Sequence, residues 1–271
     1  MKIIVVDDLF VFKFIYFHAD ILSLIMQNHY DIIIVGAGAS GFFAAINIAK
    51  KKPNLKIAIL EQSKKVLEKV KISGGGRCNV TNACSDPKEL IKNYPRGGKN
   101  LLNAFYTFNT THTIEWFEQH NIELKTEIDG RVFPKSNQSQ TIIDCLLEQA
   151  ALYDIQIIKQ AKVMRFDVGE TFNVYYNDKK LVADYVLMAS GSSNTVWQLL
   201  KNTGHEIIAP VPSLFTFNIQ HDLIKGLEGI TIADVQCTIS NTKVVTNGAL
   251  LITHTGLSGP AILKLSAFGA R

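Results

Sequence analysis

The hydrophobic pattern of the chain changes its period repeatedly, and the changes predict alternating strands and helices. Residues 32–35 are an unbroken run of Ile and Val, which is typical of a strand buried on both faces of a parallel sheet. Small and apolar residues follow over 42–49, and this helix should end at the lysines before Pro53. A second apolar run over 56–60 predicts the next strand. This order is typical of an α/β fold with a parallel sheet.

The same patterns predict the remaining elements up to residue 204. Helices are expected over 101–108, over 114–122 with Thr110 or Thr111 as N-cap, over 140–153 with Ser139 as N-cap, and over 196–201 with Gly204 at its C-terminal cap. Strands are expected over 155–158, 161–166 and 184–191, with hairpins that turn at Asp129–Gly130 and at Asn177–Asp178.

From residue 214 onward the pattern becomes mainly β. Strand-like segments lie at 215–219, 230–239, 244–245 and 250–253, and a turn at 256–260 leads into a helix for which Ser258 is the candidate cap. A proline-containing connector precedes them at 209–213. We therefore expect one domain over 30–204 and the start of a β-rich domain over 205–271.

Three glycines mark the turn between the first strand and the first helix. Gly36, Gly38 and Gly41 have the spacing G-x-G-x-x-G, which allows a tight turn, a close backbone approach to a pyrophosphate and close helix packing. Glu61 closes the second strand 20 residues after Gly41, where a carboxylate accepts hydrogen bonds from a ribose diol and repels a 2′-phosphate. The unit predicts an adenine dinucleotide of the FAD or NAD kind rather than NADP. The competing interpretation is a glycine-rich turn without a ligand.

A second glycine-rich segment, ISGGGRCNVTNAC, follows over residues 72–84. The three glycines Gly74–Gly76 cannot form the interior of a stable helix or strand, so they predict a loop whose backbone can face a ligand. Arg77 adds a positively charged fork, and Asn79 adds a short polar group. Because the loop follows the ribose-binding acid, we expect it to run along the dinucleotide toward its far end. An ordinary flexible turn is the alternative.

The composition narrows the classes of function. The 271 residues are 47% hydrophobic and 19% charged, with a net charge of +4, which fits a globular protein with one large or two ordinary domains. The lysines are scattered without a basic stripe interleaved with aromatic residues, so no nucleic-acid partner is predicted. The four cysteines, Cys78, Cys84, Cys145 and Cys237, show no metal-ligand spacing. We therefore predict no metal and the mostly reduced thiols of a cytoplasmic protein.

Residues 1–29 are interpreted as an N-terminal extension that is not part of the fold. Residues 9–26 are mostly apolar, but Lys13 and Asp20 lie among them, and a membrane core penalises charged side chains. No small-residue cleavage site follows, which argues against a signal peptide. No membrane partner is therefore predicted.

The sequence resembles a known family at several motifs. The G-x-G-x-x-G segment, Glu61 and above all Lys71–Asn82 (KISGGGRCNVTN) are similar to those of the FAD-binding flavoproteins known as BaiN-like or aminoacetone-oxidase-like oxidoreductases. Tyr94–Arg96, Gly130–Pro134 and Thr253–Pro260 also match. The resemblance runs from residue 30 to the end. It implies that the protein binds FAD and that a second domain is inserted into the FAD-binding domain. It also implies redox activity on a small molecule, although the physiological substrate is generally not established for the family. NAD(P)H is a candidate transient reductant.

The predicted cofactor-binding residues combine the motifs with the resemblance. In the family fold the main chain near Val163 meets the adenine, and residues 184–191 resemble a second FAD signature whose small residues let the chain pass close to the cofactor. Ser190 stands where that signature usually has threonine. The predicted set is Gly36, Gly38, Ala39, Ser40, Gly41, Glu61, Gln62, Lys71, Ser73, Gly74, Gly75, Gly76, Arg77, Cys78, Asn79, Val163, Ala189, Ser190 and Gly191.

An inserted domain requires the chain to return to the FAD-binding domain. No returning strand, glycine turn and helix is found in the sequence, so we expect a C-terminally truncated product that is inactive alone.

No catalytic residue is predicted. His254 is a candidate proton donor, but a lone histidine in a turn is more often structural. Arg131 either faces the flavin site or flanks the predicted turn, and Trp116 is expected in the core. Besides an FAD-dependent oxidoreductase, two alternatives stay open. One is a pyridine nucleotide-disulfide reductase-like enzyme using Cys78 and Cys84, whose spacing is off by one. The other is a non-catalytic FAD-binding accessory protein.

Overall fold

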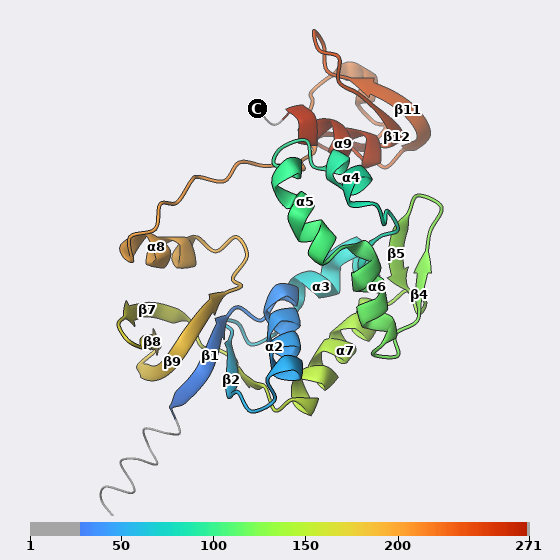
Figure 1. Ribbon diagram of the computed structural model, residues 1–271. Coiled ribbons are helices and arrows are strands. Elements are labelled where there is room, and N and C mark those ends of the chain that lie inside the picture. The colour runs from blue at the N-terminus through green and yellow to red at the C-terminus, as the bar shows by residue number, and fades with distance from the viewer. Residues whose placement is uncertain (1–27, 270–271) are drawn as a thin grey trace, which may run out of the picture. The chain divides into compact units, whose positions relative to one another are not determined.

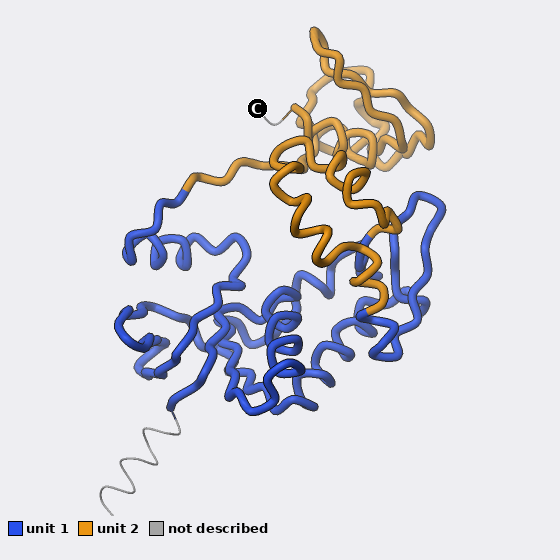
Figure 2. Tube along the Cα trace, in the orientation of Figure 1, with its two compact units in different colours: residues 1–81, 116–207 blue, residues 82–115, 208–271 orange. Residues whose placement is uncertain are grey.

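The computed structural model describes residues 28–269, and the expectations for residues 1–27 lie outside it. The chain divides into two compact units, which Figure 2 colours separately. Within the described residues, unit 1 comprises 28–81 and 116–207, and unit 2 comprises 82–115 and 208–269. The domain boundaries expected from the sequence stay predictions.

A six-stranded sheet forms the centre of unit 1 (Figure 1). β1 pairs in parallel with both β2 and β9, and β2 pairs in parallel with β6. β9, β8 and β7 form an antiparallel meander. The structure therefore confirms the predicted parallel sheet, and the hairpin predicted at Asn177–Asp178 joins β8 to β9 in the meander. The strands in spatial order are β6 (Gln156–Ile158), β2 (Ile57–Leu60), β1 (His29–Val35), β9 (Lys179–Met188), β8 (Phe172–Tyr176) and β7 (Val163–Val168).

Both faces of β1 are buried, as its run of Ile and Val predicts. Successive side chains of a strand point to opposite faces, so Ile34 lies in one core while Ile33 and Val35 lie in another. The first core is shared with the helices α2 (Ala39–Lys51), α3 (Glu68–Ile72) and α7 (Ser139–Leu152). The second is shared with the meander and α8 (Asn194–Asn202). Each Ile side chain buried in this way contributes about 1.5–3 kcal/mol to folding.

The first core also holds Trp116, which confirms its predicted core position. Its side chain is 6% exposed, and its indole Nε1 donates to Asn47 Oδ1 at 3.1 Å. This hydrogen bond joins α6 (Thr110–Glu118) to α2.

Two helix caps differ from the predicted ones because each expected cap finds another partner. The N-cap of α7 is Gln138, while the hydroxyl of Ser139 donates to the carbonyl oxygen of Lys71 at 2.8 Å. At the start of α6, Asn109 Oδ1 accepts from the backbone N–H groups of residues 111 and 112, and the hydroxyl of Thr110 donates to the carbonyl oxygen of Cys84. At α8 the glycine prediction is confirmed, because Gly204 follows the C-cap with φ +92.

A hairpin of β4 (Leu124–Thr126) and β5 (Arg131–Pro134) confirms the predicted turn at Asp129–Gly130. The N–H of Gly130 donates to the carbonyl oxygen of Glu127 at 2.9 Å, and the N–H of Glu127 donates to that of Arg131 at 2.8 Å. β5 lies between β4 and the short strand β3 (Thr81–Asn82). Between α3 and β3 lies the glycine loop, whose short segment η1 (Ser73–Gly76) is kinked by left-handed conformations at Gly74 and Gly75.

Unit 2 contains a four-stranded antiparallel sheet and several short helices. Its strands in spatial order are β10 (Phe217–Asn218), β13 (Gly256–Ser258), β12 (Val245–Thr253) and β11 (Thr231–Thr238). Its helical elements are α4 (Pro87–Leu90), η2 (Ile91–Asn93), α5 (Gly98–Thr107), η3 (Asp222–Ile224) and α9 (Pro260–Gly269). Ser258 lies inside β13 rather than capping α9, so that expectation is wrong. The buried Ser266 of α9 accepts a hydrogen bond from the N–H of Phe215 at 3.0 Å.

Candidate dinucleotide site at the carboxyl end of the sheet

The glycine turn joins the end of β1 to the start of α2. Gly36 has φ +114, and a Cβ on it would lie 2.5 Å from the carbonyl oxygen of Ala189 at the end of β9. A Cβ on Gly41 would lie 2.0 Å from the carbonyl oxygen of Gly36, so α2 packs directly on the turn. A Cβ on Gly38 would meet nothing within 4 Å. The packing of the chain therefore explains Gly36 and Gly41, but it does not explain Gly38.

The N-terminus of α2 is open to solvent beside Gly38. Ala39 and Ser40 are exposed, Gly38 is the N-cap, and no side chain caps the helix. The first turn contains no acidic residue. Because the first N–H groups of a helix have no partner within it, such an N-terminus favours a negatively charged ligand.

Glu61 follows β2, and its carboxylate reaches back to the glycine turn. Oε2 accepts from the N–H of Ala37 at 3.0 Å, and Oε1 accepts from the N–H and the hydroxyl of Ser63 at 2.9 and 3.0 Å. These bonds fix the carboxylate beside the turn. A carboxylate has about four acceptor positions, so it keeps capacity for a further donor such as a ribose hydroxyl.

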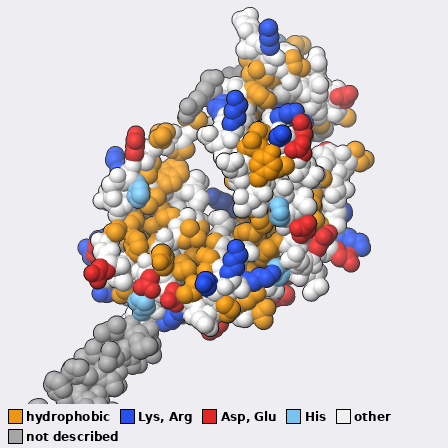
Figure 3. All heavy atoms as spheres, in the orientation of Figure 1, with side chains coloured by type: hydrophobic (Ala, Val, Ile, Leu, Met, Phe, Trp, Pro, Cys, Tyr) orange, Lys and Arg blue, Asp and Glu red, His pale blue; other side chains and the backbone are white. Residues whose placement is uncertain are grey.

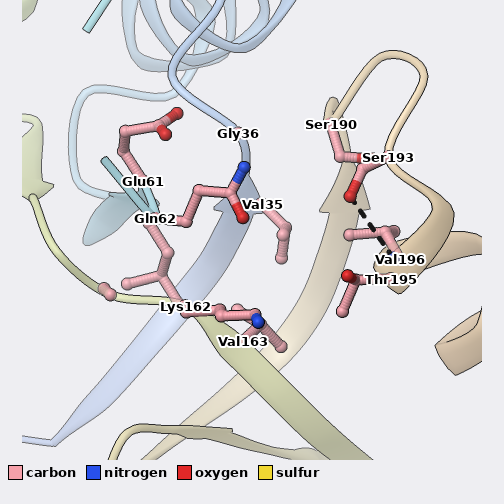
Figure 4. Close-up of a pocket in the computed structure, with 12 residues that line it drawn as sticks. Val35, Gly36, Glu61, Gln62, Lys162, Val163, Ser190, Ser193, Thr195 and Val196 are labelled. Atoms are coloured by element: carbon pink, nitrogen blue, oxygen red, sulfur yellow. Dashed lines mark hydrogen bonds between the residues drawn. The ribbon is translucent and has the colours of Figure 1, made fainter. Parts of the chain in front are cut away.

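A pocket opens where these segments meet. Figure 4 shows Glu61 and Gln62 on one side of it, Ser190 and Ser193 on the other, and Lys162 and Val163 along its base. Five of the predicted residues line it together: Gly36, Glu61, Gln62, Val163 and Ser190. They come from the carboxyl ends of β1, β2 and β9 and from the start of β7. Open α/β sheets bind ligands outside the carboxyl ends of their strands, at the point where the strand order reverses, which here is β1, between β2 and β9.

Four further polar residues belong to this region and are not among those predicted from the sequence. Lys162, Ser193 and Thr195 line the pocket, and a Cβ on Gly191 would lie 3.5 Å from the Nζ of Lys69. Ser193 carried a usable signal, because a serine directly before a helical segment is a typical N-cap and its Oγ accepts from the N–H of Val196. Lys69 and Lys162 have no such sequence signal, because nothing in their local sequence distinguishes them from other surface lysines.

The loop Ser73–Asn79 does not line this pocket. Gly74, Gly75 and Gly76 have φ values of +56, +68 and +84, which are the left-handed conformations that glycine adopts without strain. A Cβ on Gly75 or Gly76 would meet nothing within 4 Å, so the backbone is open to approach at both positions. Lys71, just before the loop, has an exposed side chain.

The guanidinium of Arg77 turns toward the β4–β5 hairpin. Nη1 and Nη2 lie 2.6 and 3.5 Å from the two carboxylate oxygens of Glu127, and the group lies over the ring of Phe133 at 3.9 Å from its centroid. Arg131 donates to Asp129 at 2.7 Å and to Glu127 at 3.2 Å, so its contacts fit the interpretation in which it flanks the turn.

The cysteines near the loop differ in their surroundings. Cys78 has a positive φ of +60 and is buried, and burial raises the pKa of its thiol. A raised pKa disfavours the thiolate, which is the reactive form. Cys84 belongs to unit 2 and is only partly buried. Both thiols are free.

Other candidate chemistry is sparse in the part of the chain that the structure describes. His254 is exposed in the turn between β12 and β13. Over residues 28–269, no three His, Cys, Asp or Glu side chains gather in a way that could hold a metal ion. None of the helices described there has the length and apolar character needed to cross a membrane. On the face that Figure 3 shows, basic and acidic side chains are interspersed.

Comparison with known proteins places this geometry in a family. A family profile described as "HI0933-like protein Rossmann domain" matches residues 30–262. The chain is 26% identical over 254 residues to a protein named ribosomal RNA dihydrouridine synthase from Escherichia coli (strain K12), covering 89% of this chain and 62% of that protein. It is 26% identical over 244 residues to a 3-dehydro-bile acid delta(4,6)-reductase from Clostridium scindens, covering 86% of this chain and 59% of that protein.

The chain therefore spans about three fifths of the length of these curated relatives, 62% and 59% respectively. Among solved structures, THI4 of Thermovibrio ammonificans is similar with a TM-score of 0.46 and 13% identity, over 74% of this chain and 72% of that chain.

Proposed function

The chain belongs to the HI0933-like family, the FAD-binding Rossmann family that its motifs resemble, and we propose that it binds FAD non-covalently as the cofactor-binding part of an oxidoreductase. When bound, FAD would supply the redox chemistry, while the chain supplies binding, orientation and the local electrostatic environment.

The open space at Gly38 is the observation that carries this proposal. Gly36 and Gly41 are required by the packing of the chain, whereas a side chain at Gly38 would meet only empty space at the N-terminus of α2. A glycine at that position lets a ligand approach the backbone. The partial positive charge of the helix N-terminus favours an anionic ligand, and the pyrophosphate of a dinucleotide has that charge.

The residues around this point fit the adenosine half of the cofactor. The carboxylate of Glu61, fixed by Ala37 and Ser63, would accept hydrogen bonds from the ribose diol. The adenine would lie against the main chain near Val163, on the side of the pocket away from Glu61. The exposed glycines of the loop Ser73–Asn79 would meet the part of FAD nearer the flavin.

The relatives point to reduction of a ring double bond as the reaction class. Dihydrouridine is uridine with two added hydrogens, and a delta(4,6)-reductase acts on ring double bonds. We extend this shared chemistry to the present chain as a proposal, with NAD(P)H as the candidate source of electrons. The expectation of a small-molecule substrate stays a prediction, and the relatives named for ribosomal RNA make a nucleic-acid substrate the alternative.

No observation among the described residues favours the disulfide-reductase alternative. Cys78 is buried, and the raised pKa of its thiol opposes the thiolate that exchange with a disulfide requires. The non-catalytic accessory role would use the same FAD site, so it differs from the main proposal only in turnover.

The test is FAD titration of the full chain and of two variants matched in chemistry. Glu61→Gln removes one acceptor from the predicted ribose contact, and Glu68→Gln makes the same change at an exposed acid of α3. Because hydrogen bonds to a charged group contribute about 1.5–3 kcal/mol, Glu61→Gln should raise the dissociation constant of FAD about tenfold or more.

The control Glu68→Gln should leave the affinity for FAD unchanged. Thermal unfolding of both variants without FAD shows whether any loss reflects the fold, because Glu61 also bonds Ala37 and Ser63. If the wild-type chain shows no affinity for FAD, the proposal is wrong. If Glu61→Gln binds FAD as the wild type does, the ribose role of Glu61 is wrong.

A further inference from the structure

The hydrogen bonds within the glycine loop are too few to hold its backbone in one conformation. Three consecutive glycines have more backbone freedom to lose than any other three residues. Within the loop the structure provides a bond from the N–H of Cys78 to the carbonyl oxygen of Ser73 at 3.0 Å, and a longer one from the N–H of Arg77 to that of Gly74 at 3.4 Å. A loop that meets a cofactor must keep one shape, so further contacts have to hold it.

The side chain of Arg77 provides those contacts from within the loop. Its guanidinium faces both carboxylate oxygens of Glu127, at 2.6 and 3.5 Å, and the two side chains are 33% and 27% exposed. Hydrogen bonding to Arg77 lowers the pKa of Glu127, so this carboxylate is ionised at neutral pH. The planar fork of arginine matches a carboxylate in a way that the point charge of lysine does not.

The ring of Phe133 packs against the glycine loop. It is fully buried, the guanidinium of Arg77 lies 3.9 Å from its centroid, and a Cβ on Gly74 would lie 3.0 Å from its Cε1. Phe133 of β5 therefore lies beside Gly74, at the start of the glycine run, and under the guanidinium of Arg77, which follows the run. Next to it the N–H of Val80 donates to the carbonyl oxygen of Val132 at 2.8 Å, which joins the end of the loop to the same strand.

Glu127 is itself held by the hairpin turn. Its N–H donates to the carbonyl oxygen of Arg131, its carbonyl oxygen accepts from Gly130, and its Oε2 accepts from the guanidinium of Arg131 at 3.2 Å. Glu127 is therefore part of the hydrogen-bonded turn that joins β4 to β5 (Figure 1). A rigid carboxylate can fix the position of the arginine that it binds.

We propose that Glu127 and Arg77 are positioning residues, which clamp the glycine loop Ser73–Asn79 to the β4–β5 hairpin in the shape that receives the cofactor. Arg77 then acts on the ligand through the loop backbone rather than by its own guanidinium. This inference rests on the proposed FAD site, and it assigns a function to a hairpin that contributes no residue to the pocket beside Glu61.

The experiment compares two substitutions on the same hairpin in the full chain. Glu127→Gln removes the charge of the clamp and keeps its shape. Glu123→Gln is the matched control, because Glu123 pairs with Lys135 rather than with a loop residue, at 2.8 Å, with 74% and 68% of the two side chains exposed. The readouts are the affinity for FAD, the visible circular dichroism of bound flavin, and hydrogen exchange of residues 73–79.

We expect Glu127→Gln to raise the dissociation constant of FAD about fivefold, to change the flavin dichroism and to speed exchange in the loop, while Glu123→Gln changes each by less than about twofold. Arg77→Lys should reproduce the effects of Glu127→Gln, and the double variant should add little because both act through one pair.

Two outcomes would overturn the clamp. One is equal loop exchange in Glu127→Gln, Glu123→Gln and the wild type. The other is an Arg77→Lys variant that binds FAD weakly while its loop exchanges at the wild-type rate, because Arg77 would then contact the cofactor directly. Exchange is measurable without FAD, so a wild-type chain that binds no FAD would refute the proposed function and still leave the clamp tested.

Discussion

Replacing the three glycines of the β1–α2 turn one at a time should separate stability from cofactor binding. A Cβ added to Gly36 or Gly41 would lie 2.5 or 2.0 Å from a backbone oxygen, whereas a Cβ added to Gly38 would point into open space. Gly38 also has an ordinary extended conformation, with φ −88 and ψ −175, that alanine can adopt. Alanine at Gly38 should therefore affect the ligand, and alanine at Gly36 or Gly41 should affect the fold.

The magnitudes follow from these contacts. For Gly38→Ala, lower freedom of the unfolded chain stabilises by about 0.4–1 kcal/mol, and the loss of glycine at an N-cap costs a similar amount. The free energy of unfolding should therefore stay within about 1 kcal/mol of wild type, a Tm shift of at most about 4 °C. For Gly41→Ala and Gly36→Ala, overpacking costs about 1–3 kcal/mol or more, and Gly36→Ala adds about 1–2 kcal/mol for its positive φ.

The assay measures the Tm of each variant by circular dichroism without FAD, and then titrates the folded variants with FAD. A methyl group at Gly38 blocks the approach of the pyrophosphate to the N-terminus of α2, so the dissociation constant should rise about tenfold or more. Gly41→Ala should lose about 2–12 °C in Tm, which corresponds to the overpacking cost of about 1–3 kcal/mol. A Gly38→Ala chain with wild-type affinity for FAD would refute the reasoning, since the open space would then not be the place of the cofactor.

Two further predictions concern titratable side chains. Burial raises the pKa of Cys145 to about 11, so at pH 8 its thiolate fraction should be about a hundredfold below that of a thiol with pKa 9. Alkylation should therefore modify the partly buried Cys84 and Cys237 well before Cys145. Equal alkylation rates for all thiols would contradict the buried position of Cys145 on α7. Hydrogen bonding to Arg77 holds the pKa of Glu127 below its ordinary value of 4.5, so the clamp is fully present above pH 4.5 and is lost as the pH falls through the lowered value. Hydrogen exchange of residues 73–79, corrected for the intrinsic rate, should rise only below about pH 4.5, and a rise at neutral pH would contradict an ionic clamp.

The elements near the glycine turn could be predicted because their signals are local. The Ile and Val run of β1, the spacing of Gly36, Gly38 and Gly41, and the turn at Asp129–Gly130 each depend on a few consecutive residues. The caps were less predictable because they depend on distant partners. Ser139 bonds the carbonyl of Lys71, 68 positions away, and a local pattern cannot show that competing acceptor.

Partners that are distant in the sequence also limit how much of the candidate site can be predicted. The predicted contact of Arg77 with the cofactor stays a prediction, and no local pattern could show that its guanidinium pairs with Glu127, 50 positions later in the chain. Lys162 and Thr195 line the pocket because β7 and α8 bring them there, and no spacing in the sequence relates them to Glu61. Residues that approach a site through tertiary packing need the fold before they can be recognised.

The central place of β1 also determines when the sheet can be completed on the ribosome. Val35 pairs with Met188, which is synthesised about 150 residues later. At about 5–20 residues per second, this interval lasts about 8–30 s. During it β1 has no partner on its β9 side, and Ile33 and Val35 lack the meander that buries them. A nascent chain therefore presents an open apolar strand edge, which makes its yield in a cell sensitive to chaperone supply and to the speed of translation.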